Sequence, residues 1–248
     1  MKNFKNITVS IVSHGQFNLL LPLLKDLRDC KSLSKIIVTI NIKEKITKPK
    51  WLYDVPIFWI YNQYVKGFGA NHNNAFKFCN TKYFCVLNPD IRLKTKILDD
   101  LIFIKEKEKI NIIGPSILNI KEAKSLNSRK FPGFFFLFTS IFMYPREEFF
   151  YKENDNFLLT DWIGGMFLVF SKKDYATLNG FDTDYFLFFE DVDICKRANK
   201  IGFKVAQSKH IFAIHDAQRR SYSNIFHFMY HIKSYFLYLI KHVIKLNL

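Results

Sequence analysis

Short runs of apolar, β-branched residues alternate with stretches of helical periodicity through the first half of the chain. The expected strands cover residues 7–12, 36–40, 57–61, 83–87 and 111–114, and the expected helices cover residues 17–27, 67–78 and 94–107. Strands that alternate with helices at this interval are typical of βαβ units, in which a helix crosses over between two parallel strands. The pattern therefore predicts an α/β fold with a mostly parallel sheet flanked by helices.

The second half of the chain is less regular. Residues 120–160 mix Lys, Asn, Phe and Pro without a clean period, and we interpret them as a variable insertion. Beyond them the pattern predicts strands at 166–170, 185–189 and 211–214, and helices at 172–178 and 190–199. We expect one domain over residues 1–222, including the insertion, and a C-terminal amphipathic helix over residues 223–248.

The charge of the chain is strongly basic, with 37 Lys and Arg against 22 Asp and Glu, a net charge of +15. Nucleic acids, phosphates and acidic membrane surfaces are the partners that such a charge favours. The lysines are scattered and no RNA-binding signature appears, which argues against the alternative of a nucleic-acid-binding protein. With 49% hydrophobic and 24% charged residues, the composition excludes a disordered tail, a collagen-like fibre and a small disulfide scaffold.

The four cysteines include no C-x-x-C pair, so neither a zinc knuckle nor a redox motif is expected. Their spacing favours a reduced cytosolic environment, in which cysteines pack as small apolar residues. The N-terminal residues do not resemble a signal peptide. The longest uncharged run, residues 131–145, is shorter than the ~20 residues of a helix that spans a bilayer. We therefore expect a cytoplasmic protein, either free or bound to a membrane surface.

Carboxylates follow two of the expected strands. Asp90 ends the tripeptide Asn-Pro-Asp directly after the strand at 83–87, where it is well placed to hold a divalent cation against a diphosphate. The same tripeptide also suits a simple type I turn. Glu190 and Asp191 begin an expected helix. They are either helix caps or a functional pair. In such a pair one residue takes a proton from a hydroxyl, and the other binds the substrate or supports the structure.

Two further groups of polar residues stand at expected turns. Gly67 and Gly69 open a helix rich in amide side chains, which suits phosphate or sugar recognition, but no complete dinucleotide fingerprint or Walker motif is present. His215 ends the expected strand at 211–214, with Arg219 and Arg220 close behind it. The histidine could ligate a metal and the arginines could clamp phosphate, although a hydrogen-bonded structural histidine fits the same pattern.

These motifs occur together and in a fixed order. In that combination the chain resembles the inverting family 2 glycosyltransferases, and within them the rhamnosyltransferase-like enzymes of bacterial surface polysaccharide assembly. The strongest matching segment is Asp-Trp-Ile-Gly-Gly-Met-Phe at residues 161–167. The other matching segments are 9–14, 66–73, 86–90, 180–182, 185–193 and 215–217. The resemblance covers residues 7 to 222, with a weak match at the insertion.

The resemblance implies a GT-A fold, a nucleotide-sugar donor and a divalent cation, Mg²⁺ or Mn²⁺. It implies that Asp191 is the catalytic base and that Glu190 helps to hold the acceptor. Asp90 and His215 are implied to bind the metal or the diphosphate. Substrate binding is implied for Ser13, Asn41, Gly67, Asn73, Trp162, Gly164, Gly165, Glu190, Arg219 and Arg220.

The identity of the donor is less constrained. The family commonly ends its second strand with an Asp that contacts the nucleobase or ribose, whereas this chain has Asn41 there. From the resemblance alone we expect dTDP-rhamnose as the donor and a UDP-linked sugar as the second choice. The implied reaction is a single in-line displacement that inverts the anomeric configuration and needs no covalent nucleophile.

The implied acceptor is a lipid-linked saccharide at the cytoplasmic face of the bacterial inner membrane, in assembly of an O-antigen or capsule. A non-catalytic scaffold of such an assembly remains as the alternative to an enzyme. Retention of the acidic pair together with Asp90 and His215 argues against the scaffold.

The C-terminal pattern places apolar residues at three- and four-residue spacing from Ile225 to Val243. Histidines, Ser234 and lysines occupy much of the opposite side. Such a helix either packs on the sheet as an ordinary terminal helix or lies on an anionic membrane surface. Its aromatic residues and lysines favour the membrane surface, and the apolar stretch at 131–144 would add a second contact.

Overall fold

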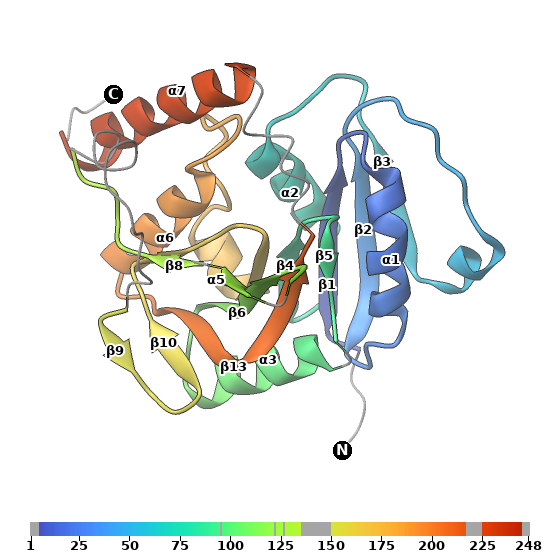
Figure 1. Cartoon of the computed structure of the whole chain (residues 1–248), viewed down its shortest axis with the longest axis horizontal. Helices are drawn as coiled ribbons and strands as arrows, with labels where there is room; N and C mark the ends of the chain where they lie inside the picture. Colours follow the sequence, from blue (N-terminus) through green and yellow to red (C-terminus); the bar gives the residue numbers. More distant parts are fainter. Residues whose placement is uncertain are drawn as a thin grey trace.

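The computed structural model describes residues 5–94, 96–121, 123–125, 127–134, 150–216 and 225–244 (Figure 1). Within these ranges most strands join one sheet in the order β3-β2-β1-β4-β12-β6-β13-β10-β9, and β5 and β7 pair with β13 and β6. Helices pack against both faces of this sheet. The α/β architecture predicted from the alternation of strands and helices is therefore confirmed.

The first half of the sheet is parallel, as predicted. Its strands are β1 (Ile7–Ser13), β2 (Leu33–Ile40), β3 (Ile57–Tyr61) and β4 (Tyr83–Leu87), and its connections contain α1 (Phe17–Arg28), the 3-10 helix η1 (Lys50–Asp54) and α2 (Phe68–Phe76). Ile11 in β1 lies opposite Val38 in β2 and Leu87 in β4. This register brings the carboxyl ends of the three strands to the same edge of the sheet.

The second half of the sheet mixes strand directions. It contains β5 (Ile91–Arg92), α3 (Ile97–Lys107), β6 (Ile112–Asn119), β12 (Phe167–Ser171), α5 (Lys172–Thr177), α6 (Glu190–Lys200) and β13 (Val205–His215). β12 is antiparallel to both β4 and β6, whereas β13 is parallel to β6 and antiparallel to β5. The last strand is much longer than the predicted 211–214, because its polar residues Gln207 and Ser208 are buried in the sheet.

The segment interpreted as an insertion, 120–160, is partly built into the fold. It contributes β7 (Lys124–Ser125), β8 (Ser128–Arg129), β9 (Lys152–Glu153) and β10 (Phe157–Leu159). β10 pairs with β13, and β8 pairs with β11 (Trp162–Ile163) in a separate two-stranded sheet. Residues 135–149, which hold most of the apolar stretch at 131–144, lie outside the described residues.

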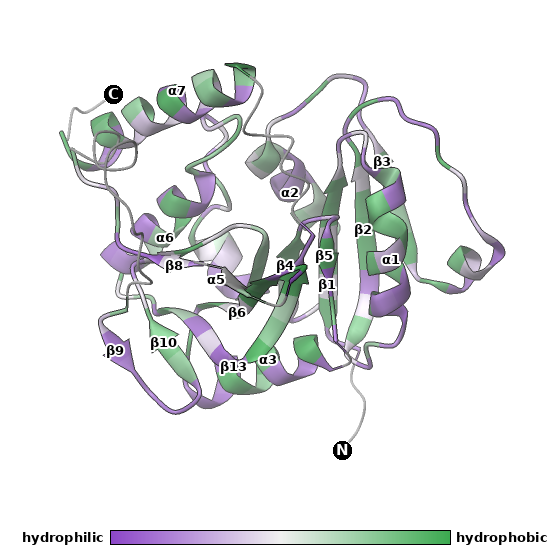
Figure 2. Cartoon of the chain, viewed as in Figure 1, coloured by the Kyte–Doolittle hydropathy of each residue, from purple (hydrophilic) through white to green (hydrophobic). Residues whose placement is uncertain are grey.

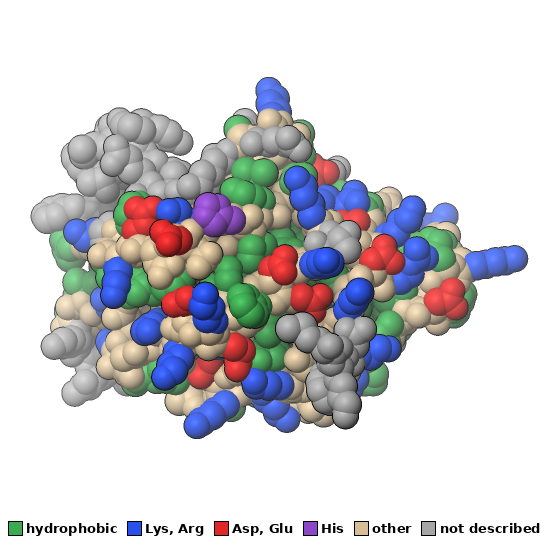
Figure 3. Space-filling model, turned by 90° about the horizontal axis from the view of Figure 1, so that it is seen from below, with side chains coloured by type: hydrophobic (Ala, Val, Ile, Leu, Met, Phe, Trp, Pro, Cys, Tyr) green, Lys and Arg blue, Asp and Glu red, His purple; other side chains and the backbone are tan. Residues whose placement is uncertain are grey.

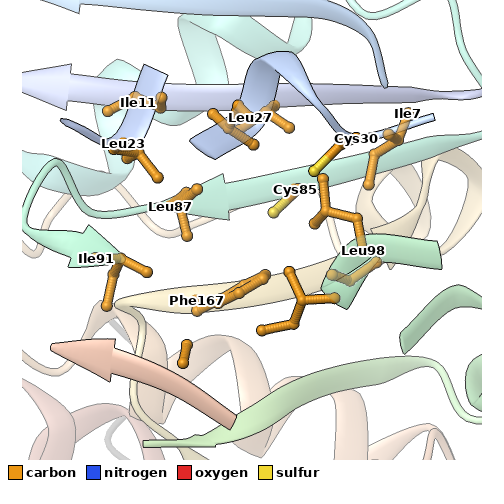
Figure 4. Close-up of a cluster of buried hydrophobic side chains, with 14 of the residues drawn as sticks. Ile7, Ile11, Leu23, Leu27, Cys30, Cys85, Leu87, Ile91, Leu98 and Phe167 are labelled. Atoms are coloured by element: carbon orange, nitrogen blue, oxygen red, sulfur yellow. The ribbon is translucent and has the colours of Figure 1, made fainter. Parts of the chain in front are cut away.

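The core has two layers, one on each face of the sheet. The first layer packs α1 and α3 against alternate residues of β1, β2 and β4, and Figure 4 shows part of it. The second layer packs α5 and α6 against Phe84, Val86 and their neighbours, and the C-terminal helix adds Tyr235, Tyr238 and Leu239 to this cluster beside Phe189. All four cysteines are buried and free, as expected of cysteines that act as apolar packing residues. Figure 2 shows the hydrophobic strands β1, β2 and β4 beside helices with mixed surfaces.

The prediction of a strand at residues 185–189 is wrong. These residues form a series of bends, and both Phe188 and Phe189 have a φ of +67°. Tyr185 and Phe189 are buried in the second core layer, and such packing overrides the β propensity of aromatic residues. Two left-handed residues in succession also turn the chain sharply, so that Glu190 starts α6 directly.

The C-terminal helix α7 (Ile225–His242) is present, and it covers the loop that leads into α6 (Figure 1). Its buried residues are Ser234, Tyr235, Tyr238 and Leu239. Most of its apolar stripe, including Met229 and Phe236, is exposed instead of packed on the sheet. Of the helices that the structure describes, none combines the length and apolarity needed to cross a membrane.

Candidate active site

Polar residues gather where the parallel strands end. Ser13 ends β1, Asn41 follows β2, and Asp90 lies shortly after β4. In open α/β sheets, ligands bind outside the carboxyl ends of the strands, because loops rather than sheet surround that edge. This edge is therefore the candidate active site.

Asp90 and His215 meet at this edge, although 125 residues separate them in the chain. β5 follows Asp90 at once and pairs with the end of β13, so that Ile91 lies opposite His215. His215 Nε2 lies 3.1 Å from Asp90 Oδ2, and the amide of Asp216 donates to the carbonyl of Asp90. The short strand β5 thus brings the two predicted metal ligands together.

The pair is suited to a hard divalent cation. Asp90 Oδ1 is buried and has no hydrogen-bond partner among the residues that the structure describes, which leaves a carboxylate oxygen available to a ligand. Within the described residues, no group of three or more His, Cys, Asp or Glu is arranged to hold a metal. Mg²⁺ usually takes one or two protein carboxylates and completes its shell with phosphate oxygens and water. Asp90 and His215 fit that role but not a closed, all-protein metal site.

The carboxylate of Asp191 is held by backbone amides. Oδ2 accepts a 2.8 Å hydrogen bond from Gly165, and Oδ1 accepts one from the amide of Val192. A Cβ at Gly165 would lie 3.1 Å from Cβ of Asp191, so the close approach depends on glycine. Burial raises the pKa of Asp191, while the amide hydrogen bonds and the charge of Arg129 oppose that rise. The geometry describes a half-buried carboxylate that two backbone amides hold in place.

Glu190, the neighbour of Asp191, has a different environment. It is buried, and its Oε2 has no hydrogen-bond partner within the described part of the chain. Burial, followed by the negative charge of Asp191, raises the pKa of Glu190 well above its usual range. Burial thus favours the neutral form of Glu190, in which a carboxyl can donate a hydrogen bond. The two neighbouring carboxyl groups therefore have different surroundings.

One backbone segment joins the two polar centres. Gly165 donates to Asp191, and the carbonyl of the next residue, Met166, accepts a 2.9 Å hydrogen bond from the amide of Asn88. Asn88 begins the turn that carries Asp90. The acidic pair of α6 and the Asp90–His215 pair are thus placed relative to each other by two consecutive residues that directly precede β12.

Two residues of the site were missed by the sequence analysis. Asn127 accepts a hydrogen bond from the amide of Gly164 at its Oδ1 (3.1 Å), and a Cβ on that glycine would lie only 2.7 Å from this oxygen. Arg129 lies opposite Trp162 in the β8–β11 pair, with its guanidinium 5.6 Å from the indole centroid. Both belong to the segment that we interpreted as an insertion, and its lack of periodicity concealed them.

The predicted nucleotide-binding residues form a separate amide network. The side chain of Asn41 donates to the carbonyl of Lys66 (2.9 Å) and accepts from the amide of Lys66 and from Asn62. Asn71 donates to the carbonyl of Gly67 (3.0 Å). Both the oxygen and the nitrogen of the Asn41 amide therefore contact Lys66 and support the turn at 66–67. Ser13 Oγ accepts a hydrogen bond from the amide of Gln16.

Gly67 is held against the loop before α6. The amide of Phe68 donates to the carbonyl of Phe186, and a Cβ at Gly67 would lie 2.5 Å from that carbonyl oxygen. This contact holds the turn at residues 66–67 beside the segment that leads to Glu190.

Asn73 is not joined to these groups. Its side chain accepts from Tyr175 and from the amide of Phe181 and donates to the carbonyl of Phe181, so it holds the turn at Gly180. A surface hollow of about 680 Å³ opens beside Asn73, and neither Asp90 nor Asp191 lines it. Arg219 and Arg220, the predicted phosphate-binding arginines, lie outside the described residues.

The comparison with known sequences identifies two curated relatives. The chain is 31% identical to rhamnosyltransferase WbbL of Escherichia coli K12 over 262 residues, which cover 97% of this chain and 95% of the relative. It is 24% identical to the low-salt glycan biosynthesis hexosyltransferase Agl10 of Haloferax volcanii, over 60% of this chain and 48% of that protein. No protein-family model matches the sequence.

The comparison with solved structures agrees on the fold. GalNAc-T7, crystallised with UDP, GalNAc and Mn²⁺, superposes with a TM-score of 0.71 at 11% identity, over 97% of this chain and 48% of its own. The mannosyltransferase PcManGT of Pyrobaculum calidifontis, in complex with GDP-Man and Mn²⁺, superposes with a TM-score of 0.63 at 12% identity. This match covers 95% of this chain and 64% of the PcManGT chain. The chain thus spans about half of the first structure and under two thirds of the second.

Proposed function

The chain belongs to the GT-A glycosyltransferases of glycan biosynthesis, in the family of rhamnosyltransferase WbbL, and we propose that it is a metal-dependent, inverting enzyme. The observation that carries this proposal is the link through Gly165 and Met166 between Asp191 and the turn that carries Asp90. An in-line displacement at an anomeric carbon needs a base for the acceptor on one side. It needs a group that stabilises the leaving diphosphate on the other side.

Asp90 and His215 would hold Mg²⁺ or Mn²⁺ together with the donor diphosphate. The unpartnered Oδ1 of Asp90 supports this assignment, and the Mn²⁺ in the GalNAc-T7 and PcManGT complexes agrees with it. A divalent cation there neutralises negative charge that develops on the leaving nucleoside diphosphate.

Asp191 would accept the proton of the acceptor hydroxyl as that oxygen attacks the anomeric carbon. Its amide hydrogen bonds hold the carboxylate in place, which favours the ionised form that a base needs. Glu190, whose neutral form burial favours, would donate a hydrogen bond to the acceptor. A single displacement of this kind inverts the anomeric configuration and leaves no covalent enzyme intermediate.

The proposed donor is dTDP-rhamnose, with a UDP-linked sugar as the second candidate. The name of the relative that covers almost the whole chain, a rhamnosyltransferase, supports the first. The turn at residues 66–67, near the carboxyl end of β2, would support the nucleotide. Ser13, Asn41 and Gly67 would form the wall of the nucleotide-binding site. Asn41, whose amide is used by the protein, would act by fixing this wall rather than by contacting the base.

The proposed acceptor is a lipid-linked saccharide in the assembly of a bacterial surface polysaccharide such as an O-antigen or capsule. The enzyme would then act at the cytoplasmic face of the inner membrane as a peripheral protein. Basic and acidic side chains alternate over the face seen in Figure 3, without the continuous basic groove that a nucleic-acid partner favours.

The test combines binding with turnover. Thermal unfolding with dTDP, UDP and GDP in the presence of Mn²⁺ identifies the nucleotide, because saturation at 100 times Kd stabilises by about 2.7 kcal/mol. Nucleotide release and the anomeric configuration of the product then measure transfer. We expect Asp191→Asn to abolish turnover and to leave nucleotide binding within a few-fold of wild type.

The matched control is Asp29→Asn, a change of the same type at an exposed carboxylate. This variant should retain wild-type turnover. Retention of more than about a tenth of the turnover by Asp191→Asn would exclude Asp191 as the base, since a general base contributes 10²–10⁴-fold.

A further inference from the structure

Helix α7 has two faces of unusual character. Its inner face carries the polar residues: Ser234 donates to the carbonyl of Leu187 (2.8 Å), and His242 lies 2.7 Å from the buried carboxylate of Asp193. Lys241 forms an ion pair with Asp182. Tyr235, Tyr238 and Leu239 are buried on the same side, so the inner face combines these polar contacts with aromatic and apolar packing.

The outer face of α7 is apolar and exposed to solvent. Its large side chains are between 42% and 65% exposed, and they are Ile225, Phe226, Phe228, Met229, Phe236 and Val243. Beside them Phe134 is 61% exposed, and its carbonyl accepts a hydrogen bond from Tyr235 of the helix. Contiguous exposed apolar surface of this kind marks an interaction site, because a protein that stays free in water rarely retains it.

The charge around this face selects its partner. Residues 225–244 contain no Asp or Glu, and Lys233 is exposed on the outer side. The chain as a whole carries a net charge of +15. An apolar and aromatic helix face that carries Lys233 complements the headgroup region of an anionic bilayer, where acyl chains accept the apolar side chains and lipid phosphates attract the lysine.

We propose that the outer face of α7 docks this protein on the surface of an anionic lipid bilayer. A second copy of the chain fits the same face less well. A two-fold symmetric interface would set the helix against itself, with Lys233 on both sides and no carboxylate in the helix to pair with it.

The inner face of α7 connects this docking surface to the catalytic residues. Phe189, which directly precedes Glu190 and Asp191, packs its ring against His231, Tyr235 and Tyr238. The docking helix and the acidic pair therefore belong to one packed unit. This part of the inference rests on the proposed function: a bilayer bound at α7 would keep the base close to a lipid-linked acceptor.

Flotation of the full-length chain with vesicles tests the proposal. The probes are vesicles of phosphatidylcholine alone and of phosphatidylcholine mixed with phosphatidylglycerol. We expect flotation with the anionic vesicles, a decrease with rising salt, and little flotation with the neutral ones. The variant Met229→Gln/Phe236→Gln, which changes exposed side chains without changing charge, should lower the bound fraction roughly tenfold.

The matched control is Phe103→Gln/Tyr53→Gln, two equally exposed residues on α3 and η1 that should leave flotation unchanged. Circular dichroism and melting temperature establish that both variants fold. Equal flotation of the α7 variant and wild type overturns the proposal, and so does absence of wild-type flotation. A wild-type dimer that the α7 variant converts to a monomer, without vesicle binding, assigns the face to self-association instead.

Nucleotide release from a soluble donor is measured in parallel. Vesicle binding without donor turnover contradicts the proposed enzymatic function and leaves the docking surface intact. Donor turnover without vesicle binding contradicts only the docking surface.

Discussion

The amide of Gly165 donates a 2.8 Å hydrogen bond to Oδ2 of Asp191, and the missing side chain of the glycine makes this contact possible. The same hydrogen bond favours the ionised form of this half-buried carboxylate. The glycine thus acts on both the position and the charge of the proposed base.

Gly165→Ala should therefore lower kcat more than it alters nucleotide binding. The added Cβ would lie 3.1 Å from Cβ of Asp191, so that the carboxylate must move by a few tenths of an ångström. Because misplacement of a catalytic group is costly, we expect a loss of about tenfold or more in kcat. Gly133→Ala, where an added Cβ meets nothing within 4 Å, is the control. Equal kcat for both variants would contradict the role given to Gly165.

Asp90→Ala should weaken binding of a nucleoside diphosphate only when metal is present. The reason is that its unpartnered Oδ1 is proposed to meet the cation rather than the nucleotide itself. Titration calorimetry with and without Mn²⁺ measures the difference, and His215→Gln should show the same pattern in weaker form. Full transfer activity in excess chelator would argue against the metal.

Much of the fold could be predicted from the sequence, because the patterns that indicate its strands and helices depend on neighbouring residues. The parallel strands β1 to β4 are short apolar runs between amphipathic helices, and their periodicity does not depend on distant residues. The segment 185–189 shows the limit. Its aromatic residues favour a strand, yet packing against α7 and α6 folds them into bends with two left-handed phenylalanines.

The same limit applies to the site. Asp90 and His215 were predicted from their places at the ends of strands, and Asp191 from its place at the start of a helix; the β5–β13 pairing brings the first two into contact. Asn73 belongs to the same motif as Gly67, but its amide holds a turn 108 residues away. Spacing along a helix does not reveal which side chain a distant loop will occupy.

The buried histidine His72 predicts a pH dependence of stability. Burial lowers its pKa to about 3, far below the value of about 6.5 expected in the unfolded chain. The unfolded state therefore takes up a proton at a higher pH than the folded state does. Stability should be fully present above pH 6.5 and should fall as the pH drops toward 3.

His72→Gln removes this titration and keeps a side chain able to hydrogen-bond to Ser10, which His72 contacts at 2.8 Å. Urea unfolding measured at several pH values should give a flatter curve for this variant between pH 6.5 and 3. His210→Gln, at an exposed histidine, should follow the wild-type curve. Parallel curves for wild type and His72→Gln would show that other groups govern acid unfolding.

Arg129 should set the acidic limb of the pH–rate profile. Its positive charge helps to hold the pKa of Asp191 down against the effect of burial. In Arg129→Gln that pKa rises, so Asp191 becomes ionised only at higher pH and the acidic limb of kcat/KM moves upward. Turnover on the alkaline side of the profile should change much less, because there the carboxylate is ionised in both proteins.

Two further variants separate this effect from a loss of structure. Arg129→Lys keeps the charge and should restore much of the wild-type profile, even though a lysine stacks less well on Trp162. Lys130→Gln removes one positive charge from the next residue, which is exposed, and should leave the acidic limb in place. A uniform loss of turnover at every pH in Arg129→Gln, unrelieved by lysine, would assign Arg129 to packing against Trp162 and not to the charge of the base.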